Sequence, residues 1–196
     1  MEFQEVVRRR RMVRNFEDRP LPPEVVERIL ANALRGPSAG FSQGFEFLVL
    51  EGKEQTDRFW TVTSAERGWE KAGWPGVHSA PLLVVPLAHK QAYLDRYAEA
   101  DKGWTDRAES RWPVPYWHID TGFAALLALL TAVDCGVGAL FFGLTDPAGF
   151  RAGYGIPDAY DPIGAIAIGY AAPDKPSGSL KRGHRPKPDV IHRGAW

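Results

Sequence analysis

The sequence is poor in cysteine and has no excess of positive or negative charge. Its single cysteine, Cys135, has no second thiol for an internal disulfide, and no Cys or His residues accompany it at the spacing of a zinc site. This cysteine usage predicts a protein of the reducing cytoplasm. Lysine plus arginine equals aspartate plus glutamate at 24 each, so a net positive charge that could hold nucleic acid or an anionic membrane is lacking.

Long hydrophobic runs are also missing. The longest run, residues 123–130, is too short to cross a bilayer, and the first residues include acidic ones without an apolar stretch before a cleavage site. We therefore expect neither a membrane span nor a signal peptide. The 196 residues are 44% hydrophobic and 24% charged, a globular composition, and no repeat or linker divides them. A single domain over residues 1–196 is expected.

Apolar periodicity predicts helices interspersed with strands, which is typical of an α+β protein. The expected helices cover residues 2–11, 24–34, 54 onward, 91–100, 118–135 and 146–155. The expected strands cover residues 45–52, 81–88, 138–144 and 162–170. The wholly apolar run 81–88 indicates a central strand covered on both faces. The helix over 118–135 is apolar on all sides, so we expect it to lie in a core or against a second subunit.

Two segments fall outside this regular pattern. Residues 88–117 are rich in tryptophan and broken by prolines, and they are expected to form a lid. Residues 171–196 are rich in proline, glycine and basic residues and are expected to form a C-terminal extension. Within that extension, Val190, Ile191 and Trp196 are predicted to anchor the chain.

The strongest local feature is a run of four arginines at residues 8–11, with Arg14 four residues beyond Arg10. On a helix these two side chains would share one face. Because the guanidinium fork matches phosphate oxygens, converging arginines can form a phosphate site. A solvated basic run and a nucleic-acid patch are the other interpretations. The balanced net charge weakens the nucleic-acid interpretation and leaves the other two open.

A loop dense in glycine and serine, residues 36–47, joins an expected helix to an expected strand. Such residues expose backbone amides and allow a flat ligand to approach closely. Considered alone, the loop is better explained as an ordinary turn. The arginines that precede it in the sequence favour a ligand-binding role.

Together these motifs resemble the opening of the nitroreductase family of flavoproteins. The family pattern Arg-Arg-Ser-x-Arg-x-Phe falls in register on residues 10–16, with Met12 in place of serine. The pattern Pro-Ser-x-x-Asn-x-Gln-Pro-Trp falls on residues 37–45, where Phe41 replaces Asn, and Gly44 and Phe45 replace Pro and Trp. The resemblance continues more diffusely through residues 134–144 and 154–173 and returns in the basic segment 184–196.

The resemblance implies a mixed sheet flanked by helices in an intertwined homodimer, with FMN bound between the subunits and residues 37–45 supplied by the neighbouring subunit. It also implies hydride transfer from NADH or NADPH through flavin N5 to a small electron-poor acceptor, such as a nitroaromatic or a quinone. No catalytic side chain is implied, because the cofactor supplies the chemistry. The implied cofactor contacts are Arg10, Arg11, Met12, Arg14, Pro37, Ser38, Ala39, Phe41, Gln43, the backbone of Ala139, Leu140, Phe141 and Phe142, and Arg185, with Arg182 as a second choice.

Other functions remain open at this stage. A nicotinamide-dependent reductase is the first choice, and the departures at Phe41 and in the lid leave room for a flavin enzyme of the same fold that acts as a dehydrogenase, a dehalogenase or a deazaflavin-linked enzyme. A non-catalytic flavin-binding protein is a further alternative. Candidates for substrate selection by stacking are Trp104, Trp112, Tyr116 and Trp117, for which packing in a core or interface is the more common role.

Overall fold

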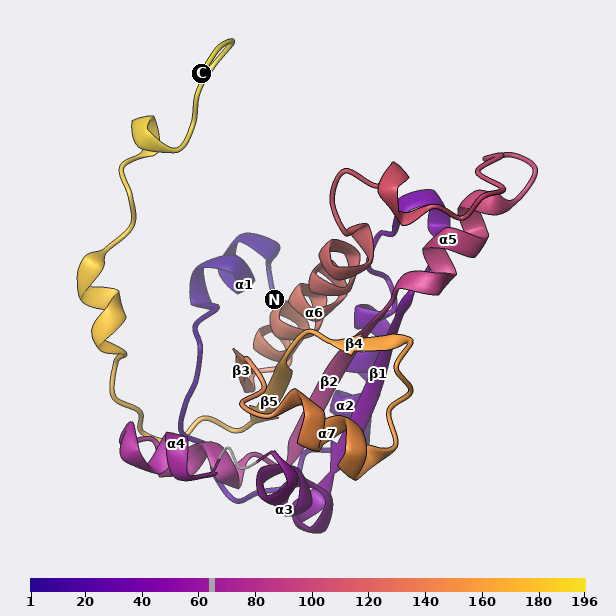
Figure 1. Ribbon diagram of the computed structural model, residues 1–196. Helices are drawn as coiled ribbons and strands as arrows, with labels where there is room; N and C mark the ends of the chain where they lie inside the picture. The colour runs from indigo at the N-terminus through magenta and orange to yellow at the C-terminus, as the bar shows by residue number, and fades with distance from the viewer. Residues whose placement is uncertain (64–65) are drawn as a thin grey trace.

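A five-stranded sheet organises the chain in the computed structural model, which describes residues 1–63 and 66–196 (Figure 1). The strands are β1 (Phe45–Glu51), β2 (Leu82–His89), β3 (Gly138–Phe142), β4 (Tyr160–Pro162) and β5 (Ala165–Gly169). Their order is β1-β2-β5-β3, and β4 pairs with β2. All the strand ladders are antiparallel. In the described residues, parallel pairing is confined to an isolated bridge between Met12 and Ala139.

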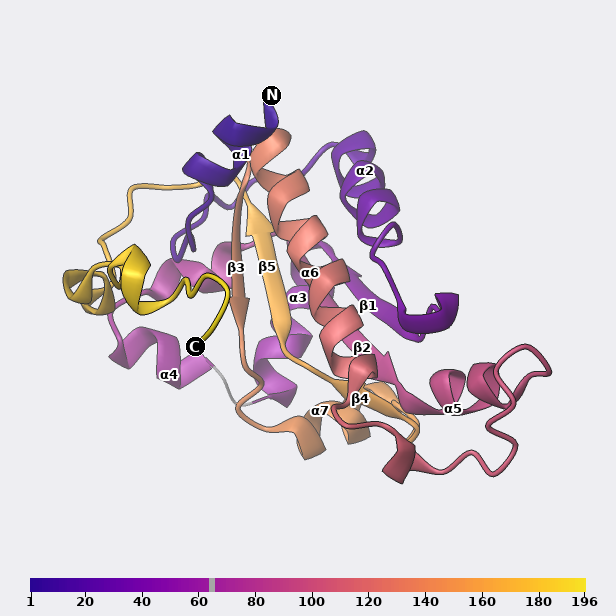
Figure 2. The same ribbon diagram turned by 90° about the horizontal axis from the view of Figure 1, so that it is seen from above.

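Helices cover both faces of this sheet, which confirms the predicted α+β class (Figures 1 and 2). They are α1 (Phe3–Arg9), α2 (Pro23–Ala33), α3 (Gly52–Val62), α4 (Glu66–Lys71), α5 (Lys90–Ala98), α6 (Tyr116–Asp134) and α7 (Pro147–Tyr154). Short 3₁₀ turns lie at Ala39–Phe41, Pro75–Ser79, Glu109–Arg111, Gly178–Arg182 and Lys187–Asp189. The predicted helices and strands occur in the expected order, but α4 was not predicted, the strand expected over residues 162–170 is divided into β4 and β5, and α6 begins two residues before the predicted helix.

The central strand β2 is buried along nearly its whole length, as its apolar run predicts. Successive side chains of a strand point to opposite faces. Leu83 and Val85 therefore lie with α3 and α7 in one core cluster, whereas Leu82 and Val84 lie with α2 and α6 in the other. Burial on both faces explains why this strand does not show the usual alternation of apolar and polar residues.

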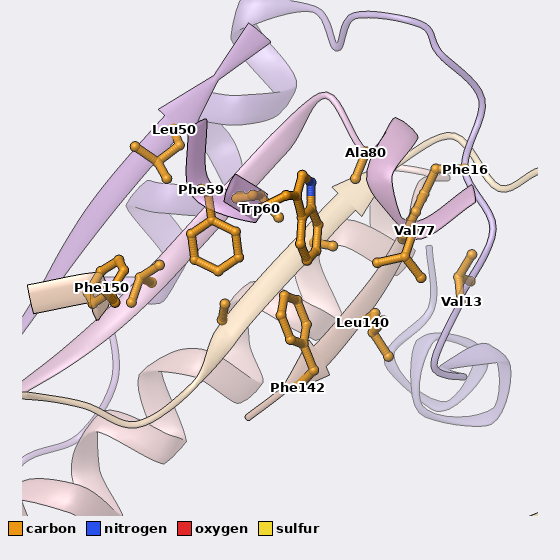
Figure 3. Close-up of a cluster of buried hydrophobic side chains, with 14 of the residues drawn as sticks. Val13, Phe16, Leu50, Phe59, Trp60, Val77, Ala80, Leu140, Phe142 and Phe150 are labelled. Atoms are coloured by element: carbon orange, nitrogen blue, oxygen red, sulfur yellow. The ribbon is translucent and has the colours of Figure 1, made fainter. Parts of the chain in front are cut away.

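Aromatic side chains fill the core on the α3 side of the sheet (Figure 3). Trp60 of α3 stacks on Phe142 of β3 with ring centroids 5.5 Å apart. Phe59 makes edge contacts with Phe142 and with Phe150 of α7. Because Phe59 and Phe150 are fully buried, this cluster ties α3 and α7 to the sheet.

On the opposite face, α6 packs against α2 and the sheet through small residues. Ala125, Ala128 and Ala132 are buried there, so the helix axis can approach the strands closely. The other side of α6 leaves Ile119, Phe123 and Leu126 exposed. Among the described residues, this helix has the length and mean hydropathy, 1.3, of a candidate membrane span, and 50% of it is buried within the protein.

Residues 12 and 13 pair with the free edge of β3, and residues 15–17 pair with residues 170–172, which follow β5. The N–H of Val13 donates to the carbonyl of Ala139 at 3.0 Å, and the N–H of Glu17 donates to the carbonyl of Tyr170 at 2.9 Å. Helix α1 therefore ends at Arg9, after which the backbone turns extended. The predicted helix over residues 2–11 is too long, and the expectation that Arg10 and Arg14 share a helical face is wrong because the segment pairs with the sheet instead.

The C-terminal extension bonds to the body of the molecule through residues 172–175. The N–H of Ala172 donates to the carbonyl of Asn15 at 3.0 Å and Lys175 Nζ donates to the carbonyl of Ala72 at 3.2 Å, after which the ribbon runs away from the sheet (Figure 1). Val190 and Ile191 are exposed, and Trp196 is fully exposed. These side chains do not anchor the extension to this chain, so the prediction that they do is wrong for the isolated subunit.

Gly138 makes the close pairing between β3 and Val13 possible. A Cβ atom at this position would lie 2.8 Å from Cγ2 of the buried Val13. We expect Gly138→Ala to lower the free energy of unfolding by about 1–3 kcal/mol, because a packed neighbour must shift. Urea unfolding measures this change. Gly143→Ala is the matched control, since its Cβ would meet no atom within 4 Å. Equal stability of the two variants would contradict the close packing at Gly138.

Candidate functional site

The run of four arginines is divided by the end of α1. Arg8 and Arg9 lie on the helix and both form ion pairs with Glu5, at 2.8 and 2.6 Å. Arg10 and Arg11 lie beyond the helix and line a cavity. The first pair is thus a solvated surface run, and the second pair belongs to a candidate binding site.

The cavity has a volume of about 450 Å³, within the range of small-molecule sites. We call it the arginine cavity. It is lined by Arg10, Arg11, Met12 and Arg14 and by Asp174, Lys175, Pro176, Ser177, Ser179, Leu180 and His184 of the extension. Arg10 is half-buried, and its guanidinium makes no hydrogen bond or ion pair with any residue that the structure describes. A partly desolvated cation of this kind favours an anionic ligand.

Arg14 and Lys175 also line the cavity, but each already makes a hydrogen bond and an aromatic contact within the chain. Arg14 donates to the carbonyl of Met12 at 3.1 Å and stacks over Trp74 at 5.3 Å. Lys175 lies 4.8 Å from the centroid of Trp74 and donates to the carbonyl of Ala72 at 3.2 Å. These contacts hold the two cations at the cavity wall, which leaves Arg10 as the cation without a partner there.

The open edge of β3 brings one backbone donor to Met12. Backbone polar groups of an antiparallel strand alternate between its two edges. The carbonyl of Ala139 and the N–H of Phe141 point toward residues 12 and 13, and the Phe141 N–H meets the Met12 sulfur at 3.4 Å. A thioether is a weak acceptor, so this N–H could instead donate to a stronger acceptor on a ligand. Leu140 and Phe142 bury their side chains in the core on the α3 side.

The predicted loop residues lie apart from the arginine cavity within this chain. Pro37, Ser38, Ala39, Phe41 and Gln43 lie beside α5, whereas α1 and the extension lie at the other side of the molecule (Figures 1 and 2). The Ser38 hydroxyl accepts from the Gln43 N–H at 2.9 Å. Phe41, with φ of 57°, is 75% exposed. A bulky apolar residue is rarely both exposed to water and in the left-handed backbone region, and strained residues of this kind cluster at functional sites.

A buried carboxylate holds this loop. Asp120 of α6 is 3% exposed, and its Oδ2 accepts from the Ala39 N–H at 2.8 Å and from the Tyr93 hydroxyl at 2.9 Å. Burial raises the pKa of Tyr93, so its hydroxyl stays protonated and donates. Sequence reasoning did not select either residue. The available signal was an acidic residue inside an otherwise apolar helix, where a charge needs hydrogen-bond partners.

Arg185 lies outside the arginine cavity in this chain. It is exposed and donates from Nη2 to the carbonyl of Asp189 at 2.7 Å, within the extension itself. Arg182 is also exposed, at the end of the 3₁₀ turn Gly178–Arg182. The predicted phosphate contacts of both residues therefore stay predictions. Among the side chains that the structure describes, no three His, Cys, Asp or Glu residues are arranged to hold a metal ion.

The tryptophans of the predicted lid form an aromatic cluster. The Trp112 ring lies within 4.5 to 6.1 Å of the rings of Tyr93, Tyr97, Trp104, Tyr116 and Trp117, measured between centroids. Trp117 is 4% exposed, so it serves packing and cannot meet a ligand in this arrangement. Tyr116 is 37% exposed and remains accessible. Packing is thus the main role of the cluster.

The family of this chain follows from comparison with known sequences. A model described as "Nitroreductase family" matches residues 7–170, which contain the arginine motif, the glycine- and serine-rich loop and the whole sheet. The chain belongs to the nitroreductase family. This assignment confirms the resemblance inferred from the sequence and supports oxidoreductase activity.

Nitroreductase-family relatives match the chain over nearly all of its length. A protein of Methanothermobacter thermautotrophicus named "Putative NADH dehydrogenase/NAD(P)H nitroreductase" is 27% identical over 207 residues, covering 100% of this chain and 88% of that protein. A protein of the same name from Archaeoglobus fulgidus is 25% identical and covers 95% of this chain and 94% of its own length.

Solved structures of the family share the fold. A nitroreductase family protein of Clostridium difficile 630 superposes with a TM-score of 0.72 at 20% identity, covering 100% of both chains. The corresponding protein of Streptococcus pneumoniae TIGR4 superposes with a TM-score of 0.73 at 20% identity, covering 98% of this chain and 100% of that one. The antiparallel sheet with helices on both faces is therefore the nitroreductase fold.

The loop contacts of Asp120 generate a stability prediction. Asp120→Ala leaves the buried Tyr93 hydroxyl and the Ala39 N–H without their acceptor, so we expect the free energy of unfolding to fall by about 2–4 kcal/mol. Tyr93→Phe removes only one donor and is expected to cost about 1 kcal/mol. Urea unfolding compares the two variants. If Asp120→Ala were no more destabilising than Tyr93→Phe, the carboxylate would not be what holds the loop.

Proposed function

We propose that this nitroreductase-family protein is an FMN-dependent oxidoreductase that uses NADH or NADPH to reduce a small electron-poor acceptor, such as a nitroaromatic or a quinone. The observation that carries the proposal is the half-buried, unpartnered guanidinium of Arg10 at a cavity of about 450 Å³. It supports a phosphate-bearing ligand, because partly desolvated arginines bind phosphate oxygens through charge-assisted hydrogen bonds.

The residues at the arginine cavity fit FMN by their chemistry. Arg10 and Arg11 would hold the phosphate, and the Phe141 N–H would donate to the flavin ring in place of the weak contact with the Met12 sulfur. When bound there, FMN would supply the hydride chemistry that links a nicotinamide donor to a second substrate. The chain contributes binding, orientation and exclusion of water. The relatives' names, which include NADH dehydrogenase and NAD(P)H nitroreductase, support a nicotinamide donor.

We also propose that the protein acts as a cytoplasmic homodimer. The exposed apolar side of α6, formed by Ile119, Phe123 and Leu126, supports this assembly, as do the exposed Phe3 and Val7 of the neighbouring α1. An apolar surface of this kind is typical of an interface. A second subunit would also bring the exposed loop of Phe41 to an arginine cavity, which one chain does not do.

The function is tested by the colour of the protein. After incubation with FMN and removal of unbound flavin, we expect a yellow protein whose flavin absorbance bleaches when NADH or NADPH is added without air. A yellow protein that does not bleach would favour a dehydrogenase, dehalogenase or deazaflavin-linked enzyme of the same fold, or a non-catalytic flavin-binding protein. A protein that stays colourless would overturn the cofactor assignment.

The phosphate site is tested by removing its unpartnered cation. Arg10→Ala is expected to weaken FMN binding at least about tenfold, because a hydrogen bond between charged groups contributes about 1.5–3 kcal/mol. Quenching of flavin fluorescence measures the dissociation constant. Arg8→Ala is the control, since Arg8 is exposed and paired with Glu5. Equal FMN affinities of the two variants would place the phosphate elsewhere.

The dimer is tested on the exposed face of α6. Phe123→Asp puts a charge into the proposed interface, so we expect a monomer by analytical ultracentrifugation and a loss of bound FMN. Thr61→Asp adds the same charge to α3, on the other face of the sheet, and is expected to leave the mass unchanged. A wild-type mass for both variants would show that α6 does not form the interface.

A further inference from the structure

One acidic side chain lies among the arginines of the proposed flavin site. Asp174, at the start of the C-terminal extension, lines the arginine cavity together with Arg10, Arg11 and Arg14. Its Oδ2 accepts from the backbone N–H of Arg14 at 2.9 Å and lies 3.7 Å from Nη1 of Arg11. The side chain is 3% exposed, although it belongs to an otherwise exposed segment.

The second oxygen of this carboxylate distinguishes it from a simple loop cap. Asp174 Oδ1 is buried and has no hydrogen-bond partner among the residues that the structure describes. A buried carboxylate oxygen without a donor is unfavourable unless nearby cations compensate for its lost hydration. The neighbouring Lys175 does not compensate for this lost hydration directly, because its ammonium group contacts the Ala72 carbonyl and the Trp74 ring. The cation that faces the carboxylate is the guanidinium of Arg11, whose Nη1 lies 3.7 Å from Oδ2.

Backbone pairing holds Asp174 in this place. The N–H of Ala172 donates to the Asn15 carbonyl, and Asn15 Nδ2 donates to the carbonyl of Pro173 at 2.6 Å. The same segment, residues 12–17, carries Arg14 and follows Arg10 and Arg11. The acidic side chain and the arginines are therefore fixed on one framework and cannot easily move apart.

We propose that Asp174 is a built-in counter-anion of the arginine cavity, which neutralises part of its positive charge and thereby limits its affinity for a phosphate group. The inference rests on the proposed flavin site. A phosphate that enters the cavity meets a resident negative charge in a partly desolvated setting, where like charges repel. Asp174 thus sets how tightly the phosphate end of the cofactor is held, while the ring contacts are unaffected.

The test compares two flavins that differ only in the phosphate. Asp174→Asn keeps an oxygen acceptor for the Arg14 N–H and removes the charge. We expect it to lower the dissociation constant of FMN about three- to tenfold, the effect of removing one unit charge several ångströms away. The dissociation constant of riboflavin, which lacks the phosphate, is expected to change less than about twofold. Quenching of flavin fluorescence by the full-length protein measures both constants.

The controls separate this inference from the proposed function. Asp158→Asn removes an exposed carboxylate outside the arginine cavity and should leave both flavin affinities unchanged. If circular dichroism shows that Asp174→Asn is unfolded, Asp174→Ser replaces it, because serine removes the charge and offers its hydroxyl oxygen as an acceptor.

Three results would count against the inference. If Asp174→Asn left the FMN affinity unchanged or weakened it, while Arg10→Ala still weakened FMN binding, Asp174 would not be a counter-anion and the flavin site would stand. If the affinities for riboflavin and FMN rose equally, the effect would not act on the phosphate. If Arg10→Ala did not weaken FMN binding, the proposed phosphate site and this inference would both be wrong.

Discussion

The pairing of residues 12–17 with the edge of β3 and with residues 170–172 is the constraint on which the rest of the site depends. An unpaired strand edge leaves N–H and C=O groups that must find partners. Val13 takes the carbonyl of Ala139, and further along the segment Asn15 and Glu17 pair with residues 170–172. This one extended segment ends α1, turns Arg10 and Arg11 toward the cavity, brings Met12 to the Phe141 N–H and attaches the C-terminal extension.

Buried and half-buried charged side chains determine which ligands the protein can bind. Asp120 satisfies its buried carboxylate with two donors and thereby fixes the exposed loop around Phe41. Arg10 has no partner, and Asp174 has only half of its carboxylate satisfied, so the arginine cavity carries opposite charges that are incompletely paired. Such an arrangement is costly in a purely structural role. It is consistent with a site that completes its hydrogen bonds when a ligand arrives.

The exposed apolar surfaces of the chain point to a larger assembly. One side of α6, the loop at Phe41 and the end of the extension at Trp196 all present large apolar side chains to water. The loop and the arginine cavity both carry residues that the family resemblance assigns to one cofactor, yet they lie apart in the fold (Figure 2). The homodimer that we propose would account for both observations, because it would cover the apolar side of α6 and bring a loop to each arginine cavity.

The sequence by itself determined the order of elements, the central place of β2, the all-round apolar character of α6 and the family, because these depend on local periodicity and on short motifs. It also selected Arg10 and Arg11, but it put Arg10 with Arg14 on a helix face that does not form. Asp120 was marked only by its place inside an apolar helix, and the partners of Asp120, Tyr93 and Asp174 could not be identified, since they lie far away in the chain. Only the tertiary structure decided which charges are buried together, because burial and pairing of a charge arise from the packing of distant segments and leave no periodic signal in the sequence.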